Sequence, residues 1–592
     1  MAFFNEFPRN RSYDDDLGWL IANMKKVIAK VDNYNEVSFA DPIAWNITTQ
    51  YPEATIVRDG IDGPLYISRK PVPVGITLNN GEYWETLGGF DQMFTGVIKN
   101  VQDYGAAGIA GADYTEQVQA AIDDGNIIYF PAGTYSFGTI SINKDIVFFG
   151  DGESSVLVPL HRNTENNAYK PMVTISTGNR VVFDSLNFTG DNSITSETGI
   201  QEYTQAVIRA YNSNIEFKKC YINDMVNDYR LTVADVPFHE REGIFLYASN
   251  CDLLIDGCVF GTTFYGNELI WASRPRANYA SGKTIIRNCT FNDRINGGSE
   301  SDGSALDILG GTIEFYNNTG KDSFYLGSFA NLMGDIVDIH DNTFTGFYGG
   351  GSMIDVSEGY YNKNTLVTIS DNYFEFEDGA RGIQAFTKNA KISNNVIKAE
   401  CPIKFLQTND YSALDTYHAT ENLETDLDEL TIINNTLIST KNGTTYYNTG
   451  LVLGQSPQSA GSRATYNKYL ISGNEFYNGE SVTTPRQQIE ILTNAILSVI
   501  GDNVFHKAGT AQSGTRLAFI GTNDSAAMKM VLNGNYFAPP ASAANVIFTN
   551  SVSGPAITAV FAGNSTEDTT NLHAGPSTLS PTILSNNANI LT

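Results

Sequence analysis

The chain has 592 residues, of which 42% are hydrophobic and only 17% are charged, so its polar character comes mainly from Asn, Thr, Ser and Gly. This composition excludes a disordered chain and a long charged coiled coil, because 33 Phe and 31 Tyr side chains require a packed interior. The formal net charge of −28 would repel phosphate backbones and anionic lipids, which makes nucleic acid and membrane surfaces poor partners.

Residues 1–11 lack the basic and then apolar layout of a signal peptide, and no apolar run reaches the roughly 18 residues of a membrane-spanning helix. We therefore expect synthesis in a host cytoplasm and no membrane insertion. Five cysteines without a CxxC pair argue against a disulfide framework and a zinc module. We expect neither a metal site nor a cofactor.

The first element expected in chain order is a short helix over residues 14–33. Its apolar positions form a two-heptad pattern made by Leu17, Ile21, Met24, Ile28 and Val31. The pattern fits either a coiled-coil seam or an amphipathic helix packed on its own chain. Residues 45–90 then alternate short strands with turn signals, which predicts a small all-β module.

Residues 101–135 read VQDYGAAGIAGADYTEQVQAAIDDGNIIYFPAGTY. A Gly-rich turn leads into an amphipathic stretch over 115–123, with Val118, Ala121 and Ile122 on one face, and then into a strand and a Pro-Ala-Gly-Thr turn. A helix of this kind can cover the open first coil of a repetitive fold.

From residue 186 to residue 564 a short sequence motif recurs. It consists of a turn residue, then a position that we call the slot, and an apolar residue two positions after the slot. The slot residues are Leu186, Cys220, Cys258, Cys289, Asn318, Asn342, Asn372, Asn395, Asn435, Asn474, Asn503, Asn535 and Asn564. They span 378 residues in twelve steps, a mean of about 31. Short apolar strands between the slots, without helical periodicity, predict an all-β parallel solenoid over 101–566.

The slot has a physical explanation if successive coils stack about 4.8 Å apart. An Asn at the same bend of each coil can bond the neighbouring backbone and the neighbouring Asn, and so satisfy groups that a sharp bend leaves unpaired. Cys220, Cys258 and Cys289 in this slot are predicted to pack as small buried side chains. The tail over 567–592 has no period and fits a disordered end, a cap on the last coil or a strand exchanged within an oligomer.

Residues 101–135 resemble the opening of the pectate-lyase-like right-handed parallel β-helix proteins. The pattern of DYGA, a Gly- and Asp-rich loop, an AI helix and FPAGTY is present, although the family's GDGxTDD is GADYTEQ here. The resemblance implies the right-handed parallel β-helix. It implies no particular chemistry, because that superfamily includes lyases, hydrolases, epimerases and non-catalytic spikes.

A helix and a small β module in front of such a solenoid resemble the anchoring region of bacteriophage tail spikes. YISRKPVPVGI and EYWETL within residues 65–87 are also similar to small carbohydrate-binding modules. The tail-spike resemblance implies a virion protein, bound to phage tail or collar proteins through residues 1–100, and a homotrimer.

Candidate catalytic residues are carboxylates on the strand that precedes each slot strand, because ionisable groups on a β-helix favour the outward face. Asp307 and Asp355 are each flanked by apolar residues and should lie with one coil between them, so that their Cα atoms are about 9.6 Å apart. This suits an inverting glycosidase, which needs roughly 6.5–9.5 Å between carboxyl groups. Glu268 with Asp307 on adjacent coils, at roughly 5 Å, would suit a retaining mechanism.

Candidate substrate-binding residues surround these carboxylates. Trp271 and Tyr325 offer ring faces to sugars, and Arg274 and Arg276 lie in a long loop where they could bind acidic groups. Asp302 and Glu358 crowd the same region and would help to keep one carboxyl protonated. The alternative is that the acids are ordinary solvated surface groups and that the aromatic column stacks inside the solenoid.

The sequence therefore predicts a phage tail spike that recognises and cleaves a bacterial surface polysaccharide as an endo-glycosidase. The DD and GHG motifs of polygalacturonases are missing from the expected positions, so only the fold and the substrate class follow from the resemblance. A receptor-binding spike without catalysis and a polysaccharide lyase remain open alternatives.

Overall fold

The computed structural model divides into two compact units, Met1–Ile98 and Lys99–Thr592, and this division lies two residues before the expected boundary. The described residues are 43–44, 46–51, 56–58, 65–68, 70–78, 80, 82–86, 98–160, 171–190, 207–223, 225–226, 245–261, 263–264, 269–274, 282–292, 294–295, 304–322, 324–325, 328–349, 351–356, 366–377, 381–385, 387–405, 426–440, 450–453, 465–478, 488–491, 495–506, 517–520, 528–537, 547–549, 557–562, 564–566 and 582–583. The helix expected over 14–33 lies outside them.

The first unit contains a four-stranded sheet in the segment where turn signals predict a small all-β module. Its strands, in sheet order, are β1 (Ile43–Ala44), β2 (Ile56–Arg58), β3 (Leu65–Ser68) and β4 (Trp84–Thr86). The β1 and β2 strands are parallel, whereas the other two pairings are antiparallel. The core of this unit consists of Tyr51, Val57, Val72, Leu78 and Trp84.

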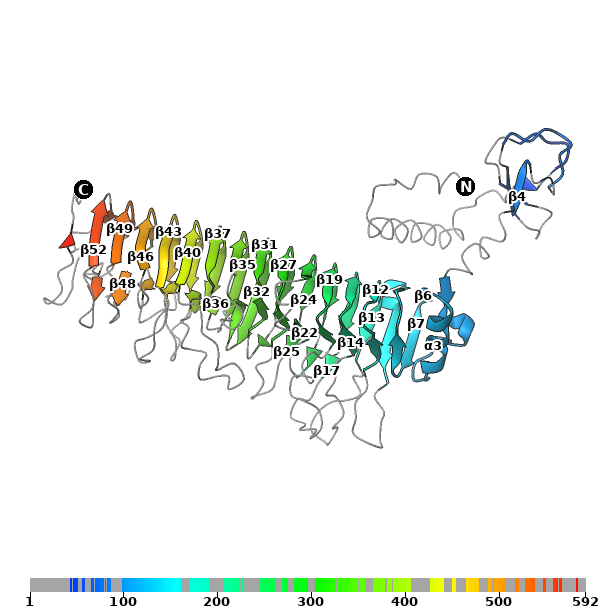
Figure 1. Ribbon diagram of the computed structural model, residues 1–592, viewed down its shortest axis with the longest axis horizontal. Helices are drawn as coiled ribbons and strands as arrows, with labels where there is room; N and C mark the ends of the chain where they lie inside the picture. The colour runs from blue at the N-terminus through cyan, green and yellow to red at the C-terminus, as the bar shows by residue number, and fades with distance from the viewer. Residues whose placement is uncertain are drawn as a thin grey trace, which may run out of the picture. The chain divides into compact units, whose positions relative to one another are not determined.

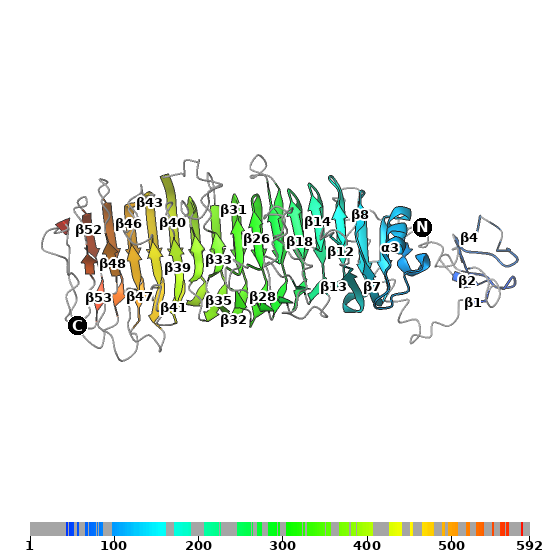
Figure 2. The same ribbon diagram turned by 90° about the horizontal axis from the view of Figure 1, so that it is seen from below.

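The second unit is a right-handed parallel β-helix, as predicted. Its strands stack in one long row in Figure 1, and Figure 2 shows the same row after a quarter turn. Three long parallel sheets form its walls, and each coil passes through sheet 1, sheet 2 and sheet 3 in that order. Alternate side chains of every strand point inward, and they form one continuous apolar core along the solenoid.

Sheet 1 has fourteen strands within the described residues. They are β8 (Ile140–Ile142), β11 (Val173–Ile175), β14 (Ile208–Tyr211), β18 (Leu246–Ser249), β22 (Ile270–Ser273), β26 (Leu306–Leu309), β30 (Ala330–Met333), β33 (Ser352–Val356), β36 (Arg381–Ala385), β39 (Cys401–Phe405), β42 (Leu451–Leu453), β45 (Ile489–Ile491), β48 (Leu517–Ile520) and β51 (Ile547–Thr549).

Sheet 2 follows sheet 1 in each coil. Its strands are β5 (Ile98–Asn100), β6 (Ile127–Phe130), β9 (Ile146–Gly150), β12 (Arg180–Asp184), β15 (Asn214–Lys218), β19 (Asp252–Asp256), β23 (Lys283–Arg287), β27 (Thr312–Tyr316), β31 (Ile336–His340), β34 (Leu366–Ser370), β37 (Asn389–Ser393), β40 (Asp426–Ile433), β43 (Thr465–Ser472), β46 (Ala495–Gly501), β49 (Met528–Asn533), β52 (Ile557–Ala562) and β54 (Thr582–Ile583).

Sheet 3 completes each coil. Its strands are β7 (Gly133–Phe137), β10 (Ser155–Pro159), β13 (Asn187–Thr189), β16 (Tyr221–Asn223), β17 (Met225–Val226), β20 (Val259–Phe260), β21 (Thr263–Phe264), β24 (Thr290–Asn292), β25 (Arg294–Ile295), β28 (Thr319–Lys321), β29 (Phe324–Tyr325), β32 (Thr343–Gly349), β35 (Tyr373–Glu377), β38 (Val396–Ala399), β41 (Thr436–Ser439), β44 (Glu475–Asn478), β47 (Val504–Phe505), β50 (Tyr536–Phe537) and β53 (Ser565–Thr566).

A single α-helix among the described residues, α3 (Thr115–Asp124), lies at the N-terminal end of the solenoid (Figure 1). Its buried residues are Val118, Ala121 and Ile122, which join the continuous core. Asp113 lies two residues before the helix, and its Oδ1 accepts the Thr115 backbone N–H at 2.9 Å. The helix thus covers the first coil with the apolar face that the sequence predicts. Two 3-10 turns, η2 (Val101–Tyr104) and η3 (Gly152–Ser154), belong to the same end.

The bend between sheet 2 and sheet 3 has the same backbone form in every described coil from Ser185 to Gly534. The residue before each slot is left-handed, with φ between +52° and +68°: Ser185, Lys219, Gly257, Asn288, Asn317, Asp341, Asp371, Asn394, Asn434, Gly473, Asp502 and Gly534. Ten of these twelve residues are Gly, Asn or Asp, the types for which this conformation costs least. The recurring turn residue of the sequence motif is therefore a conformational requirement.

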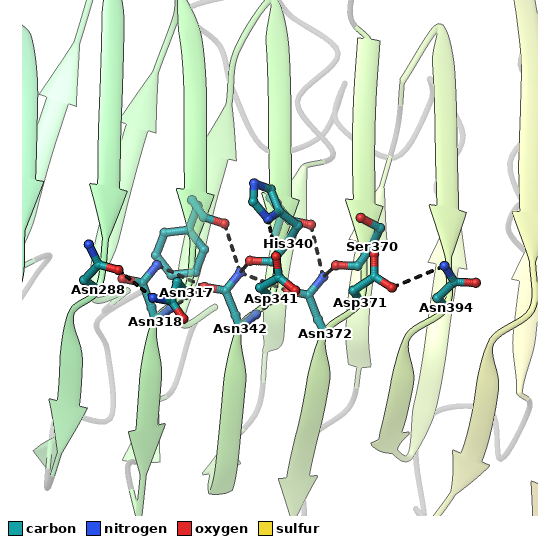
Figure 3. A network of polar contacts seen from close by, with 12 residues as sticks. Asn288, Asn317, Asn318, His340, Asp341, Asn342, Ser370, Asp371, Asn372 and Asn394 are labelled. Atoms are coloured by element: carbon teal, nitrogen blue, oxygen red, sulfur yellow. Dashed lines mark hydrogen bonds and ion pairs between the residues drawn. The ribbon is translucent and has the colours of Figure 1, made fainter.

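The slot asparagines form the predicted ladder, part of which is drawn in Figure 3. At Asn342 the backbone N–H and the side-chain Nδ2 both donate to Oδ1 of Asn372, at 3.0 and 2.9 Å. The same Nδ2 donates to the Phe315 carbonyl of the preceding coil at 2.9 Å. This pattern continues from Asn318 to Asn535, so every ladder bend has its buried polar groups satisfied.

The cysteines in the slot pack as predicted. Cys220, Cys258 and Cys289 are at most 1% exposed and follow one another on neighbouring coils. Their mutual contacts and burial raise the pKa of Cys258 well above its ordinary value. The ladder begins where the cysteines end, because the Cys289 backbone N–H donates to Oδ1 of Asn318 at 3.0 Å.

The tail continues the solenoid at the one point where it is described. The β54 strand pairs in parallel with β52, with Thr582 beside Thr558 and Ile583 beside Ala559. Of the three alternatives for residues 567–592, this favours a tail that lies on the last coil of its own chain.

Candidate active site

An outward-facing column of side chains runs along sheet 1, one residue per strand, and we call it the sheet 1 column. Strand register places in it Thr174, Arg209, Tyr247, Trp271, Asp307, Asn331, Asp355, Gln384, Lys404 and Val452. The chain neighbours of these residues on each strand are core residues, so the column faces away from the interior.

Asp307 and Asp355 occupy the same column with one strand between them. Asp307 is in register with Asn331, and Asn331 with Asp355. Two strand spacings put the Cα atoms about 9.6 Å apart. The spacing that the sequence predicts for the two carboxylates therefore agrees with the register. Asp307 is half-buried, whereas Asp355 is 8% exposed.

The predicted neighbours of this pair need correction. The residue in register with Asp307 on the preceding strand is Trp271, so this position is not held by Glu268, which lies outside the described residues. The strand between the two carboxylates is β30, and its residue in the column is Asn331. Tyr325 belongs to β29 in sheet 3, paired with β32, and is therefore not on the sheet 1 column.

The N-terminal part of the column is aromatic. The rings of Tyr247 and Trp271 stack at a centroid distance of 4.6 Å and an angle of 14°. The Arg209 guanidinium lies 5.2 Å from the centroid of the Tyr247 ring, and Tyr211 adds a tilted ring at 5.9 Å. Trp271 is in register with Asp307 on the neighbouring strand and is 8% exposed.

The C-terminal part of the column is polar and cationic. Gln384 donates from Nε2 to Oδ2 of Asp355 at 2.6 Å, and Arg381 donates from Nη1 to Oε1 of Gln384. Lys404 follows Gln384 in the column and is 3% exposed. The two carboxylates therefore have different surroundings, aromatic beside Asp307 and hydrogen-bonding beside Asp355.

Arg274 does not have the role expected from the sequence. Its side chain is buried and pairs with Asp252, with Nη2 2.8 Å from Oδ1, and it also donates to the Cys251 carbonyl at 2.5 Å. Gly282 packs so closely that a Cβ at that position would meet the guanidinium. Arg274 is thus part of the bend between sheets 1 and 2, and we do not retain it as a substrate contact. Burial raises the pKa of the adjacent Cys251 thiol to about 11.

Three further candidates, Arg276, Asp302 and Glu358, lie outside the described residues. Within the described ranges, no group of three or more His, Cys, Asp or Glu side chains could hold a metal ion. No helix in the described part of the chain is long and apolar enough to cross a membrane.

Sequence reasoning missed four residues that the register and contacts bring to the column. Asn331 has the same apolar flanks as Asp307, and an alignment of Ala330 and Leu332 with Leu306 and Ile308 would have found it. Arg209 and Tyr247 lie on earlier strands without a carboxylate, so a search for acidic residues passes over them. Arg381 reaches the column through its bond to Gln384, and this bond has no signal in the sequence.

Comparison with known proteins shows a similarity to a pectate-lyase-like family over part of the chain. Residues 98–322 match the family described as rhamnogalacturonase A/epimerase, pectate lyase-like. No curated protein has a sequence that matches the chain.

Several solved structures have a similar fold. The A-module of a mannuronan C-5 epimerase of Azotobacter vinelandii has 12% identity and a TM-score of 0.36, over 79% of this chain and 99% of that chain. Gene product 12 of bacteriophage phi29 has 11% identity and a TM-score of 0.34, over 83% and 74%. Tailspike protein 3 of bacteriophage CBA120 has 10% identity and a TM-score of 0.31, over 91% and 76%. These backbones superpose only in part, so no residue role is transferred from them.

Proposed function

We propose that the chain is a phage tail spike that binds and hydrolyses a bacterial surface polysaccharide on the sheet 1 column. The observation that carries the hydrolytic part is the register of Asp307, Asn331 and Asp355. Two carboxylates with one strand between them, and so two strand spacings apart, leave room for a water molecule, as an inverting glycosidase requires. The family similarity over residues 98–322 supports a polysaccharide as the substrate class.

The stacked rings at the N-terminal end of the column support binding of a sugar chain along the solenoid axis. Tyr247 and Trp271 form an apolar edge directly beside Asp307. A polymer lying along the column would meet the aromatic rings first, then the two carboxylates, and then Gln384 and Lys404. Endo-hydrolysis follows from this arrangement, because the column extends on both sides of the carboxylates.

The phage part of the proposal rests on the sequence resemblance of residues 1–135 and on the separate N-terminal unit. Residues 1–100 would attach the spike to tail or collar proteins, and the protein would be located in the virion. A homotrimer is part of the same proposal. The outward face of sheet 2 near its C-terminal end offers neighbouring apolar side chains for chain association, namely Leu470, Leu497, Val499 and Val531.

The test is incubation of the purified full chain with surface polysaccharide from candidate hosts, followed by measurement of new reducing ends. Asp307→Asn and Asp355→Asn should each lower the rate at least 10³-fold, on the order expected for loss of an acid or a base. Asp338→Asn, an outward carboxylate of sheet 2, is the matched control and should retain activity. Proton NMR of the first products should show inverted anomeric configuration.

Other outcomes separate the alternatives. Retention of glycan on the chain without new ends would indicate a binding spike, whereas an absorbing unsaturated product would indicate a lyase. If both aspartate variants still shorten the polymer, the assignment of these two carboxylates is wrong. Light scattering of the purified chain measures the oligomeric state, and a monomer at micromolar concentration would contradict the trimer.

A further inference from the structure

The two carboxylates of the sheet 1 column differ in a way that bears on their chemical roles. Asp355 accepts a hydrogen bond from Gln384 Nε2 at 2.6 Å, and the oxygen of the same amide accepts from Arg381. Gln384 and Asp355 are in register on neighbouring strands, and they are 6% and 8% exposed. Gln384 and Asp355 are therefore largely removed from water, whereas Arg381 is partly exposed.

The guanidinium determines the orientation of the Gln384 amide. Arginine has only donors and stays charged, so the amide must turn its oxygen toward Arg381 and its nitrogen toward Asp355. A nitrogen donor facing Asp355 requires an acceptor, and an ionised carboxylate is the strongest acceptor available. The contact therefore favours the ionised form of Asp355.

The charged groups around Asp355 act in the same direction. Its column neighbours among the described residues are Asn331 on one side and Gln384 on the other, both uncharged. Beyond them, Lys404 and Asp307 lie two strands away on opposite sides, about 9.6 Å between Cα atoms. With Arg381 added, two cations and one acid surround Asp355.

Asp307 has different surroundings. Its neighbour on one side is Trp271, which stacks on Tyr247. Asn331 lies on the other side, and its Nδ2 donates to Ser304 Oγ at 3.0 Å. An inverting pair needs one proton donor and one base, so an ionised Asp355 leaves the role of proton donor to Asp307.

We infer that the Arg381–Gln384 pair holds Asp355 ionised, which makes Asp355 the base and Asp307 the acid of the hydrolytic site. The inference rests on the proposed function. In the step, Asp355 takes a proton from water as the water oxygen bonds to the anomeric carbon. Asp307 gives its proton to the glycosidic oxygen as the bond from that oxygen to the anomeric carbon breaks. Two hydroxyl-ended products result, and solvent then returns the proton from Asp355 to Asp307. Gln384 and Arg381 are positioning residues.

The first test needs no activity. Gln384→Met keeps the length of the side chain and removes the donor, and the thermal midpoint of the full chain is measured against pH. Because the hydrogen bond favours ionised Asp355 in the folded state, its stabilisation is present above the unfolded Asp value of about 3.9 and is lost as pH falls below it. The midpoint of the variant should therefore lie below wild type at pH 7, and the gap should close toward pH 3.

The matched control for this measurement is Asn389→Leu. Asn389 also donates its amide to an aspartate, with Nδ2 3.2 Å from Asp428 Oδ2, but this pair is exposed on sheet 2. Its midpoint should differ little from wild type at any pH, because exposed contacts of this kind contribute little. If the difference in thermal midpoint between wild type and Gln384→Met stays constant with pH, or increases in acid, Asp355 is not held ionised by this hydrogen bond.

The second test uses cleavage of the host polysaccharide. Gln384→Met should move the acidic limb of kcat/KM up by about one pH unit or more, because loss of one hydrogen bond to a charge is worth about that much. Arg381→Met should move the limb in the same direction, and the double variant should add little. A role limited to stability would lower the rate equally at all pH values and would refute the inference. If wild type cleaves no glycan, both the proposed function and the acid and base roles are wrong. The thermal measurement still tests the ionisation of Asp355 in that case.

Discussion

The asparagine ladder makes a quantitative prediction at Asn435, which is 1% exposed. Its Oδ1 accepts from both the backbone N–H and the Nδ2 of Asn395, each at 3.0 Å, and its own Nδ2 donates to Asn474 Oδ1 at 2.9 Å. Asn435→Ala leaves the buried backbone N–H of Asn395 without an acceptor, whereas Nδ2 of Asn395 keeps the carbonyls of Ile369 and Ser393. At about 1–3 kcal/mol for such a group, added to about 1 kcal/mol for lost packing, the substitution should cost about 2–4 kcal/mol.

The control for this substitution is Cys258→Ala. Cys258 occupies the same slot on an earlier coil and is fully buried, and its thiol makes only weak sulfur contacts in place of the amide hydrogen bonds of the ladder. The loss of one buried atom of methylene size should cost about 1 kcal/mol. The difference between the two substitutions isolates the ladder hydrogen bonds.

Hydrogen–deuterium exchange with mass spectrometry is the appropriate assay, since the stability of a solenoid is approximately a sum of local terms. Peptides that cover residues 389–399 and 426–440 should lose protection in Asn435→Ala, whereas peptides of the first coils should not change. Equal protection in the two variants, together with equal thermal midpoints, would refute the view that the ladder contributes to stability beyond its packing.

Two further predictions concern the cysteines and the left-handed bends. All five cysteines are buried, and burial raises the pKa of Cys251 to about 11. The folded chain should therefore show no thiol that reacts with Ellman's reagent at pH 8, and the denatured chain should show five. Rapid labelling of the folded chain would contradict this prediction. Gly257 has φ +66° between coils that carry Lys219 and Asn288 in the same conformation. Gly257→Asn should therefore leave the unfolding free energy nearly unchanged, and Gly257→Val should lower it by about 1–2 kcal/mol in denaturant titrations.

The fold was predictable from the sequence because its determinants are local and repeated. The left-handed bends favour Gly, Asn or Asp, and the slots favour residues that either bond the next slot or pack as an apolar group. The opening segment, with the α3 residues Val118, Ala121 and Ile122 on one face, carries a pattern specific to this class of solenoid.

The candidate site was predictable only where apolar flanks identify the outward position. Asp307 and Asp355 have such flanks, and the register agrees with the expected spacing. Arg274 was assigned to substrate binding because its partner Asp252 lies 22 residues earlier, and no local sequence pattern indicates their ion pair. The orientation of the Gln384 amide depends on two side chains at once, so only coordinates can define it.

The uniform bends have a consequence for how such a chain can change during evolution. Each coil has the same left-handed bend, and its slot residue contacts the slot of the next coil in the same way. A whole coil can therefore be gained or lost without altering the register of the others. Distances between groups on the sheet 1 column therefore change in whole strand spacings of about 4.8 Å. Loss of the coil that carries Asn331 would place Asp307 and Asp355 on adjacent strands, near the separation of a retaining pair. Duplication or loss of coils could thus exchange one stereochemical outcome for the other, with no substitution at either carboxylate.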